Sequence, residues 1–170
     1  PSADGLTPNE QLELISAEAA PLRQEASSVW EDQLRPLLSD QGVNVVSYAS
    51  LPEVKRAVLD ELFRAEIFPV CTPLILDPAP SVPFISNRSL NLAIVLADEA
   101  GSGRLARLKI PDIMPRAIRV SKRRHDYVLI EDVIHHNLAQ LFPGVAIVSA
   151  HLFRVIRDAD IEIRELEAGD

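Results

Sequence analysis

The chain has 170 residues, of which 47% are apolar and 25% are charged, a composition typical of one folded globular domain rather than a disordered segment. It contains no apolar run near the roughly 20 residues that a membrane span needs, and its first ten residues lack the features of a signal peptide. We therefore expect a cytoplasmic protein with no membrane span, built as a single domain over residues 1–170, with a long helix over about 8–38 and an α+β body over about 43–163.

The net charge of −8 is unevenly distributed along the chain. Residues 67–130 carry nine bases and five acids, whereas the regions before and after them are acidic. Non-specific binding to nucleic acid requires many neutralised phosphates, so this acidic chain predicts no nucleic-acid partner. The basic middle region could still contact a phosphate chain.

The N-terminal region predicts a long amphipathic helix. Residues 7–10 combine a threonine cap, a proline at the first helical position and the glutamate of a capping box. Apolar residues then recur at steps of three and four through Leu37. Pro21 and Pro36 are expected to kink this helix without ending it, and Gly42 to cap its end. The apolar stripe is expected to be exposed and to need a partner.

A short strand over residues 43–48 and a second helix are predicted next. Ser50, with Glu53 three residues later, repeats the capping signature, and Pro52 is expected just inside the helix. This helix should end near Ala65.

The run 67–76 is rich in apolar and β-branched residues and predicts a strand. Pro69 and Pro73 cannot donate to a ladder, so the strand is expected at an edge or with a bulge. Cys71 has no partner for a disulfide or a four-ligand metal site and is expected to be a small buried hydrophobe. Residues 77–83, with three prolines, predict an extended loop.

Two hairpins follow in the prediction, each made of two strand-like runs around a polar or glycine-containing turn: 89–96 with 104–110, and 118–120 with 127–130. In the run 104–110, Leu105, Arg107 and Lys109 alternate with Ala106, Leu108 and Ile110, as in a half-buried strand.

The last part of the chain predicts a helix over about 131–141, stopped by residues 142–144, and then strands over 147–153 and 155–163. Helices come first and strands dominate afterwards. This order favours an α+β fold in which the long N-terminal helix and two shorter helices pack on a mixed, largely antiparallel sheet.

Few residues suggest reaction chemistry. The chain has four histidines, His125, His135, His136 and His151. The adjacent pair lies on one predicted helix, where neighbouring side chains point about 100° apart and cannot both hold one ion. No glycine-rich phosphate loop occurs, and the acidic C-terminal runs read as a strand face and a solvated tail. We therefore expect no catalytic residue, metal site or cofactor site within this chain.

The basic residues are the better functional candidates, because the planar fork of arginine matches phosphate oxygens. Arg116 and Arg157 are the predicted phosphate contacts. The alternative for Arg157 is a structural ion pair with Asp158 or Asp160, and the alternative for Lys122–Arg124 is a solvated hairpin tip.

Several irregular motifs occur in a fixed order along nearly the whole chain: Glu66-Ile67-Phe68-Pro69-Val70, Thr72-Pro73-Leu74, Phe84-Ile85-Ser86-Asn87, Ser89-Leu90-Asn91-Leu92, Leu141-Phe142-Pro143-Gly144 and Arg157-Asp158-Ala159-Asp160. Together they resemble the middle, or head, domain of bacterial polyphosphate kinases. The chain departs from the family's usual residues at Cys71, Arg88 and Ile156, and the loop 79–82 lacks the usual histidine.

This resemblance implies a parent enzyme that reversibly transfers the terminal phosphate of ATP to inorganic polyphosphate, through a phosphohistidine and with magnesium. In the family, those catalytic groups lie in other domains. The resemblance therefore implies a non-catalytic head domain with no cofactor of its own, with ATP and magnesium bound elsewhere in the parent. Its expected partners are the remaining domains, a second copy in a homo-oligomer, and polyphosphate at Arg116 and Arg157.

Two other hypotheses remain open from the sequence. One is a stand-alone, non-enzymatic binding or assembly module with the same fold, which is distinguished by whether the gene continues past Asp170. The other is a small phosphotransferase that uses one of its own histidines.

Overall fold

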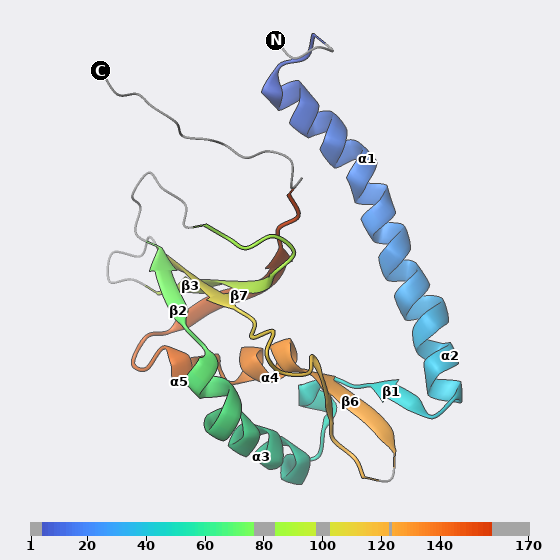
Figure 1. Cartoon of the computed structure of the whole chain (residues 1–170), viewed down its shortest axis with the longest axis vertical. Coiled ribbons are helices and arrows are strands. Elements are labelled where there is room, and N and C mark those ends of the chain that lie inside the picture. The colour runs from blue at the N-terminus through green and yellow to red at the C-terminus, as the bar shows by residue number, and fades with distance from the viewer. Residues whose placement is uncertain (1–4, 77–83, 98–102, 123, 158–170) are drawn as a thin grey trace. The chain divides into compact units, whose positions relative to one another are not determined.

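The computed structural model describes residues 5–76, 84–97, 103–122 and 124–157 (Figure 1). Contacts group the chain into two compact units, Pro1–Val46 with Arg119–Tyr127, and Ser47–Ile118 with Val128–Asp170. Helices occur with one all-antiparallel and one mixed sheet, which confirms the predicted α+β class. The division of the strands into two sheets was not predicted, and the single domain over 1–170 stays a prediction.

The first unit contains the long N-terminal helix, formed by α1 (Pro8–Ser28), a π-helical segment (Val29–Leu34) and α2 (Arg35–Asp40). The predicted capping box is confirmed: Glu10 N–H donates to Thr7 Oγ1 at 3.4 Å, and Thr7 N–H donates to Glu10 Oε2 at 2.8 Å. Gly42, with φ +76°, follows the helix end as predicted.

The helix continues past both prolines, as expected, but the π-helical segment was not predicted. Pro36 has no N–H, and its ring would clash with the carbonyl four residues earlier in a regular α-helix. Immediately before it, Arg35 N–H donates to the Trp30 carbonyl, five residues back. This wider turn displaces the regular ladder at the proline.

The apolar side chains of α1 are exposed, as the sequence predicts: Leu12 is 64% and Leu22 is 67% exposed. No helix in the described ranges is long and apolar enough to span a membrane.

A three-stranded sheet has the order β1 (Val43–Val45), β6 (His125–Leu129), β5 (Ala117–Arg119). β1 and β6 are parallel, with Val43 opposite His125, and Asn44 Nδ2 donates to Asp126 Oδ1 at 2.9 Å. β5 and β6 are neighbours, which confirms the second predicted hairpin.

The second unit begins with a 3-10 turn (Tyr48–Ser50), so the first predicted strand is shorter than 43–48. Ser47, not Ser50, caps this turn: its Oγ accepts from Ser50 N–H at 3.2 Å. The predicted capping box at Ser50 and Glu53 is therefore wrong. Pro52 is the cap of α3 (Glu53–Leu62), and it lies before the helix instead of inside it.

The predicted end of the second helix at Ala65 and the strand over 67–72 are also wrong. The chain stays helical as a π-helical segment (Phe63–Ile67) and a 3-10 turn (Phe68–Val70). Phe63 and Ile67 are fully buried, and one more helical turn keeps both on the buried side. Only β2 (Pro73–Leu76) of the predicted strand is extended. Cys71, just before it, is half-buried instead of buried.

The four-stranded sheet has the order β2, β4 (Arg104–Lys109), β3 (Leu90–Leu96), β7 (Ile147–Arg154), with every neighbouring pair antiparallel. The β3–β4 pair confirms the first predicted hairpin. Residues 101–102 of its predicted turn and the loop 77–83 lie outside the described residues. The predicted alternation in β4 is confirmed, because Ala106 and Leu108 are fully buried.

The predicted helix over 131–141 is divided at Asn137 into α4 (Ile130–His136) and α5 (Leu138–Leu141). The buried side chains of α3, α4 and α5 add Leu59, Ile134 and Leu138 to the core. The predicted strand over 155–163 is wrong for 155–157, which have no strand pairing, and its remainder lies outside the described residues.

Candidate functional site

A cavity of about 370 Å³ lies in the second unit. The loop before β3, the segment that follows β4, the start of α4 and the end of β7 supply its lining residues. Its charged lining residues are four cations and one acid: Arg88, Lys109, Arg116, Arg154 and Asp112. We call this cavity the basic pocket. Its lining groups favour an anion over a cation.

Two of the four cations are paired within the pocket wall. Lys109 Nζ donates to Asp112 Oδ2 at 2.8 Å, and this hydrogen bond lowers the pKa of the Asp112 carboxyl. Both groups are substantially exposed, so the pair is weak and the lysine can turn towards a ligand.

Arg116 is paired with the first turn of α4. Its Nε donates to Glu131 Oε1 at 2.8 Å, and its Nη2 donates to the same oxygen. This hydrogen bond raises the pKa of Arg116. Its carbonyl accepts from Ile130 N–H at 2.8 Å, which fixes the backbone as well. Arg116 is 54% exposed, whereas Glu131 is 8% exposed. The arginine therefore reaches from a buried carboxylate to the pocket rim.

The other two cations, Arg88 and Arg154, make no side-chain hydrogen bond or ion pair within the described ranges. Arg88 N–H donates to the Val155 carbonyl at 2.8 Å, and Arg154 lies opposite Leu90 in the β3–β7 register. Backbone pairing thus brings the two arginines to the same end of the sheet. Arg88 also has φ +61°, a left-handed conformation that costs a side-chain-bearing residue about 1–2 kcal/mol.

Arg157, the other predicted phosphate contact, is not among the pocket-lining residues. Its Nη1 donates to the Ile85 carbonyl, and its guanidinium lies 5.3 Å from the centroid of the Phe84 ring. Its backbone N–H donates to Asn87 Oδ1 at 2.8 Å, and Asn87 Nδ2 donates back to the Arg157 carbonyl at 3.1 Å. Arg157 therefore braces the loop that carries Arg88. Its alternative partners, Asp158 and Asp160, lie outside the described residues.

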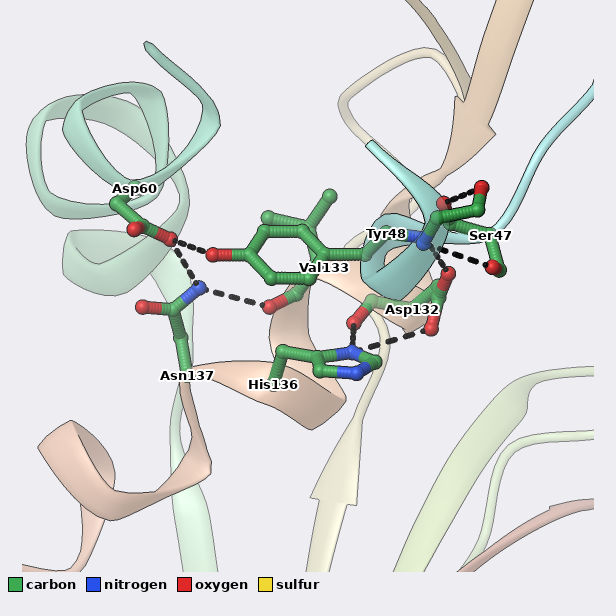
Figure 2. Close-up of polar contacts among 8 residues, drawn as sticks. Ser47, Tyr48, Asp60, Asp132, Val133, His136 and Asn137 are labelled. Carbon is green, nitrogen blue, oxygen red and sulfur yellow. Dashed lines mark hydrogen bonds and ion pairs between the residues drawn. The ribbon is translucent and has the colours of Figure 1, made fainter. Parts of the chain in front are cut away.

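A polar network around Tyr48 is the second cluster of titratable groups (Figure 2). Tyr48 OH donates to Asp60 Oδ1 at 2.6 Å, and Asn137 Nδ2 donates to the same oxygen at 3.0 Å. Tyr48 N–H donates to Asp132 Oδ2 at 2.6 Å. Burial, with a contribution from Asp60, raises the pKa of Tyr48 to about 12. The network joins the 3-10 turn, α3 and α4, so it stabilises the fold.

His136 belongs to this network, because its Nδ1 lies 3.2 Å from Asp132 Oδ1 (Figure 2). The ring of His136 stacks on Tyr48 with 4.5 Å between centroids, and its Nδ1 lies 2.9 Å from the Asp132 carbonyl oxygen, one helical turn earlier. The His135 ring is 5.6 Å away and nearly perpendicular. Within the described ranges, no three histidine, cysteine or acidic side chains come together as a metal site.

The chain is similar to known proteins over almost its whole length. It is 44% identical to polyphosphate kinase 1 of Chlorobaculum tepidum over 98% of this chain, and 45% identical to the polyphosphate kinase of Prosthecochloris aestuarii over 99%. The family described as the polyphosphate kinase middle domain matches residues 54–170. The chain belongs to this family.

The chain spans about 25% of the length of these two relatives. The middle-domain assignment also agrees with the fold. The crystal structure of polyphosphate kinase from Porphyromonas gingivalis matches 81% of this chain and 24% of that protein, with a TM-score of 0.70 and 26% identity.

Sequence reasoning found part of this middle domain's candidate site. It selected Arg116 and Arg157 as phosphate contacts, but only Arg116 lines the pocket. Contact of either residue with polyphosphate stays a prediction. It did not select Arg88 or Lys109. The positive φ of Arg88 has no sequence signal, because the residue types that favour this conformation are glycine, asparagine and aspartate.

Proposed function

We propose that this chain is the non-catalytic middle domain of a polyphosphate kinase and that its basic pocket holds part of the polyphosphate chain on its path through the enzyme. The proposal is based on the charged side chains that line the pocket. Arg88 and Arg154 are unpaired within the described ranges, and Lys109 and Arg116 are two further cationic donors. Arginine and lysine donors are the groups that bind phosphate oxygens in proteins.

The parent enzyme, in this proposal, transfers the terminal phosphate of ATP to polyphosphate, which is consistent with relatives that are named polyphosphate kinase. ATP and magnesium would bind in its other domains. Magnesium prefers carboxylate and phosphate oxygens, whereas the charged lining of the basic pocket is four cations and one acid. The residues of this pocket therefore do not fit a resident metal ion.

The proposed partners are the remaining domains of the parent and a second copy of the chain, in the cytoplasm. The exposed apolar residues of α1 support a protein partner, since large apolar patches usually mark interfaces. Sedimentation of the pure chain tests the self-association: a concentration-dependent dimer supports it, and a strict monomer at high concentration contradicts it.

The pocket assignment is tested by titrating long-chain polyphosphate into the pure chain and its Arg154→Gln variant. We expect the variant to bind about tenfold more weakly, with a shallower salt dependence, because one charge-assisted contact is lost. Arg64→Gln is the matched control. Arg64 pairs with Glu61 on α3 at 2.9 Å and is outside the pocket lining, but the substitution removes the same charge. Equal losses in both variants would show that polyphosphate binds by net charge and would overturn the assignment.

The absence of catalysis is tested separately. Radiolabelled ATP incubated with the pure chain and magnesium is expected to give neither labelled polymer nor acid-labile phosphohistidine. Either product above background would contradict the non-catalytic role.

A further inference from the structure

Arg88 has a backbone conformation that its side chain makes unfavourable. It is the only non-glycine residue with positive φ in the part of the chain that the structure describes; four glycines account for the rest. A left-handed position accepts glycine without steric cost, so folding alone would favour glycine here. Strained positions of this kind cluster at functional sites. From this strain and the position of Arg88 in the basic pocket, we infer that Arg88 is a dedicated binding residue for inorganic oligophosphate.

The turn that carries Arg88 is held without its side chain. Ser89 Oγ donates to the Ser86 carbonyl at 2.7 Å, and Arg88 contributes only its backbone N–H, which donates to Val155. Asn87 exchanges two hydrogen bonds with the backbone of Arg157. The guanidinium of Arg88 is therefore not required for the turn.

The segment before the turn is braced by two other arginines. Arg107 Nη1 donates to the Phe84 carbonyl at 3.0 Å, and Arg107 Nε donates to Asn91 Oδ1 at 3.0 Å. Arg157 Nη1 donates to the Ile85 carbonyl. The guanidinium groups of both arginines are therefore hydrogen-bonded within the domain. Arg88, on the same segment, lines the basic pocket and has no side-chain partner among the described residues.

The chemistry of the pocket points to phosphate. Arg154, the other unpaired arginine, is on the neighbouring strand end, and two guanidinium groups at one pocket repel each other unless an anion lies with them. Each presents a planar fork that can donate two hydrogen bonds to the oxygens of one phosphoryl group. This assignment rests on the proposed function, and it names Arg88 as one of the pocket residues that bind the polymer.

The test compares Arg88→Gly, Arg88→Asn and Arg88→Lys by calorimetric titration with tripolyphosphate and by thermal unfolding. Glycine and asparagine tolerate the left-handed conformation, so both variants should melt at or above the wild-type temperature. Both should also bind tripolyphosphate about tenfold or more weakly, because a charge-assisted contact is lost. Lysine keeps the charge without the fork and should retain part of the affinity. Arg64→Gln should bind as wild type.

Two results would overturn the inference. One is wild-type affinity for tripolyphosphate in Arg88→Gly and Arg88→Asn. The other is a lower melting temperature in both variants together with their loss of affinity, because the lost binding would then follow from a damaged fold. Long-chain polyphosphate is titrated in parallel. If the polymer binds and Arg154→Gln weakens it while the Arg88 variants do not, the inference fails and the proposed function stands. If the wild-type chain binds neither tripolyphosphate nor the polymer, both fail. Binding of an RNA of matched charge as tightly as the polymer would overturn the assignment to inorganic phosphate.

Discussion

Replacing Arg116 by alanine tests how much the ion pair at the pocket wall contributes to folding. Glu131 determines the answer, because only 8% of its side chain is exposed and both donors of Arg116 reach a single oxygen, Oε1. The second oxygen, Oε2, is buried with no hydrogen-bond partner in the described part of the chain. Without the guanidinium, the carboxylate loses both of these donors.

The expected loss follows from burial. Hydrogen bonds to charged groups contribute about 1.5–3 kcal/mol, and breaking a fully buried ion pair costs about 3–5 kcal/mol. Arg116 is 54% exposed, so water can replace part of what the arginine supplied. We therefore expect Arg116→Ala to lower the free energy of unfolding by about 2–3 kcal/mol and Tm by about 4–12 °C.

Urea unfolding of Arg116→Ala, Glu131→Gln and the double variant separates the pair from its surroundings. Glutamine removes the buried charge, so the double variant should be more stable than the sum of the two single losses predicts, by about 1 kcal/mol or more. A coupling within about 0.3 kcal/mol of zero, together with an unchanged Tm for Arg116→Ala, would refute the argument. It would mean that water molecules replace the hydrogen bonds of Arg116 to the Glu131 carboxylate without loss of stability.

Three further predictions concern other groups. The pKa of Tyr48 is raised to about 12 from its ordinary value of 10.0, so its contribution to stability should be complete below pH 10 and be lost as the pH rises through 12. Tyr48→Phe should remove this dependence in unfolding measured from pH 9 to 12. Burial raises the pKa of Cys71 to about 11, so alkylation by iodoacetamide at pH 8 should be much slower than for a free thiol, as followed by mass spectrometry. Arg157→Ala should lower the unfolding free energy by about 1 kcal/mol, and it should weaken tripolyphosphate binding less than Arg154→Ala does.

The sequence predicts those parts of the fold that depend on local patterns. The capping box at residues 7–10 and the alternation in β4 are both confirmed, because each depends on residues close together in the chain. The helical continuation from Ala65 to Val70 was missed. Pro69 and the apolar residues around it also fit a strand, and the burial of Phe63 and Ile67 that extends the helix is a tertiary effect.

The sequence predicts that the candidate site is basic, but it does not predict which basic residues lie together. The excess of bases over residues 67–130 favours a phosphate-binding region, and Arg116, the predicted phosphate contact, lines the pocket, although its contact with polyphosphate stays a prediction. Arg88 was missed because its place depends on the pairing of β3 with β7, which brings the end of β7 beside the turn before β3. No spacing within the sequence carries that information.

The structure divides the arginines of this region by what their guanidinium groups contact. Arg107 and Arg157 donate to backbone carbonyls of the segment 84–85 and hold it in place. Arg88 and Arg154 have no side-chain partner in the described ranges and line the pocket. A basic surface that only kept the protein soluble would not require a braced segment or a left-handed turn. The bracing arginines fix the positions of the unpaired ones, and fixed donors lose less conformational entropy when an anion binds. This arrangement supports the proposed binding of a flexible polyanion in the basic pocket.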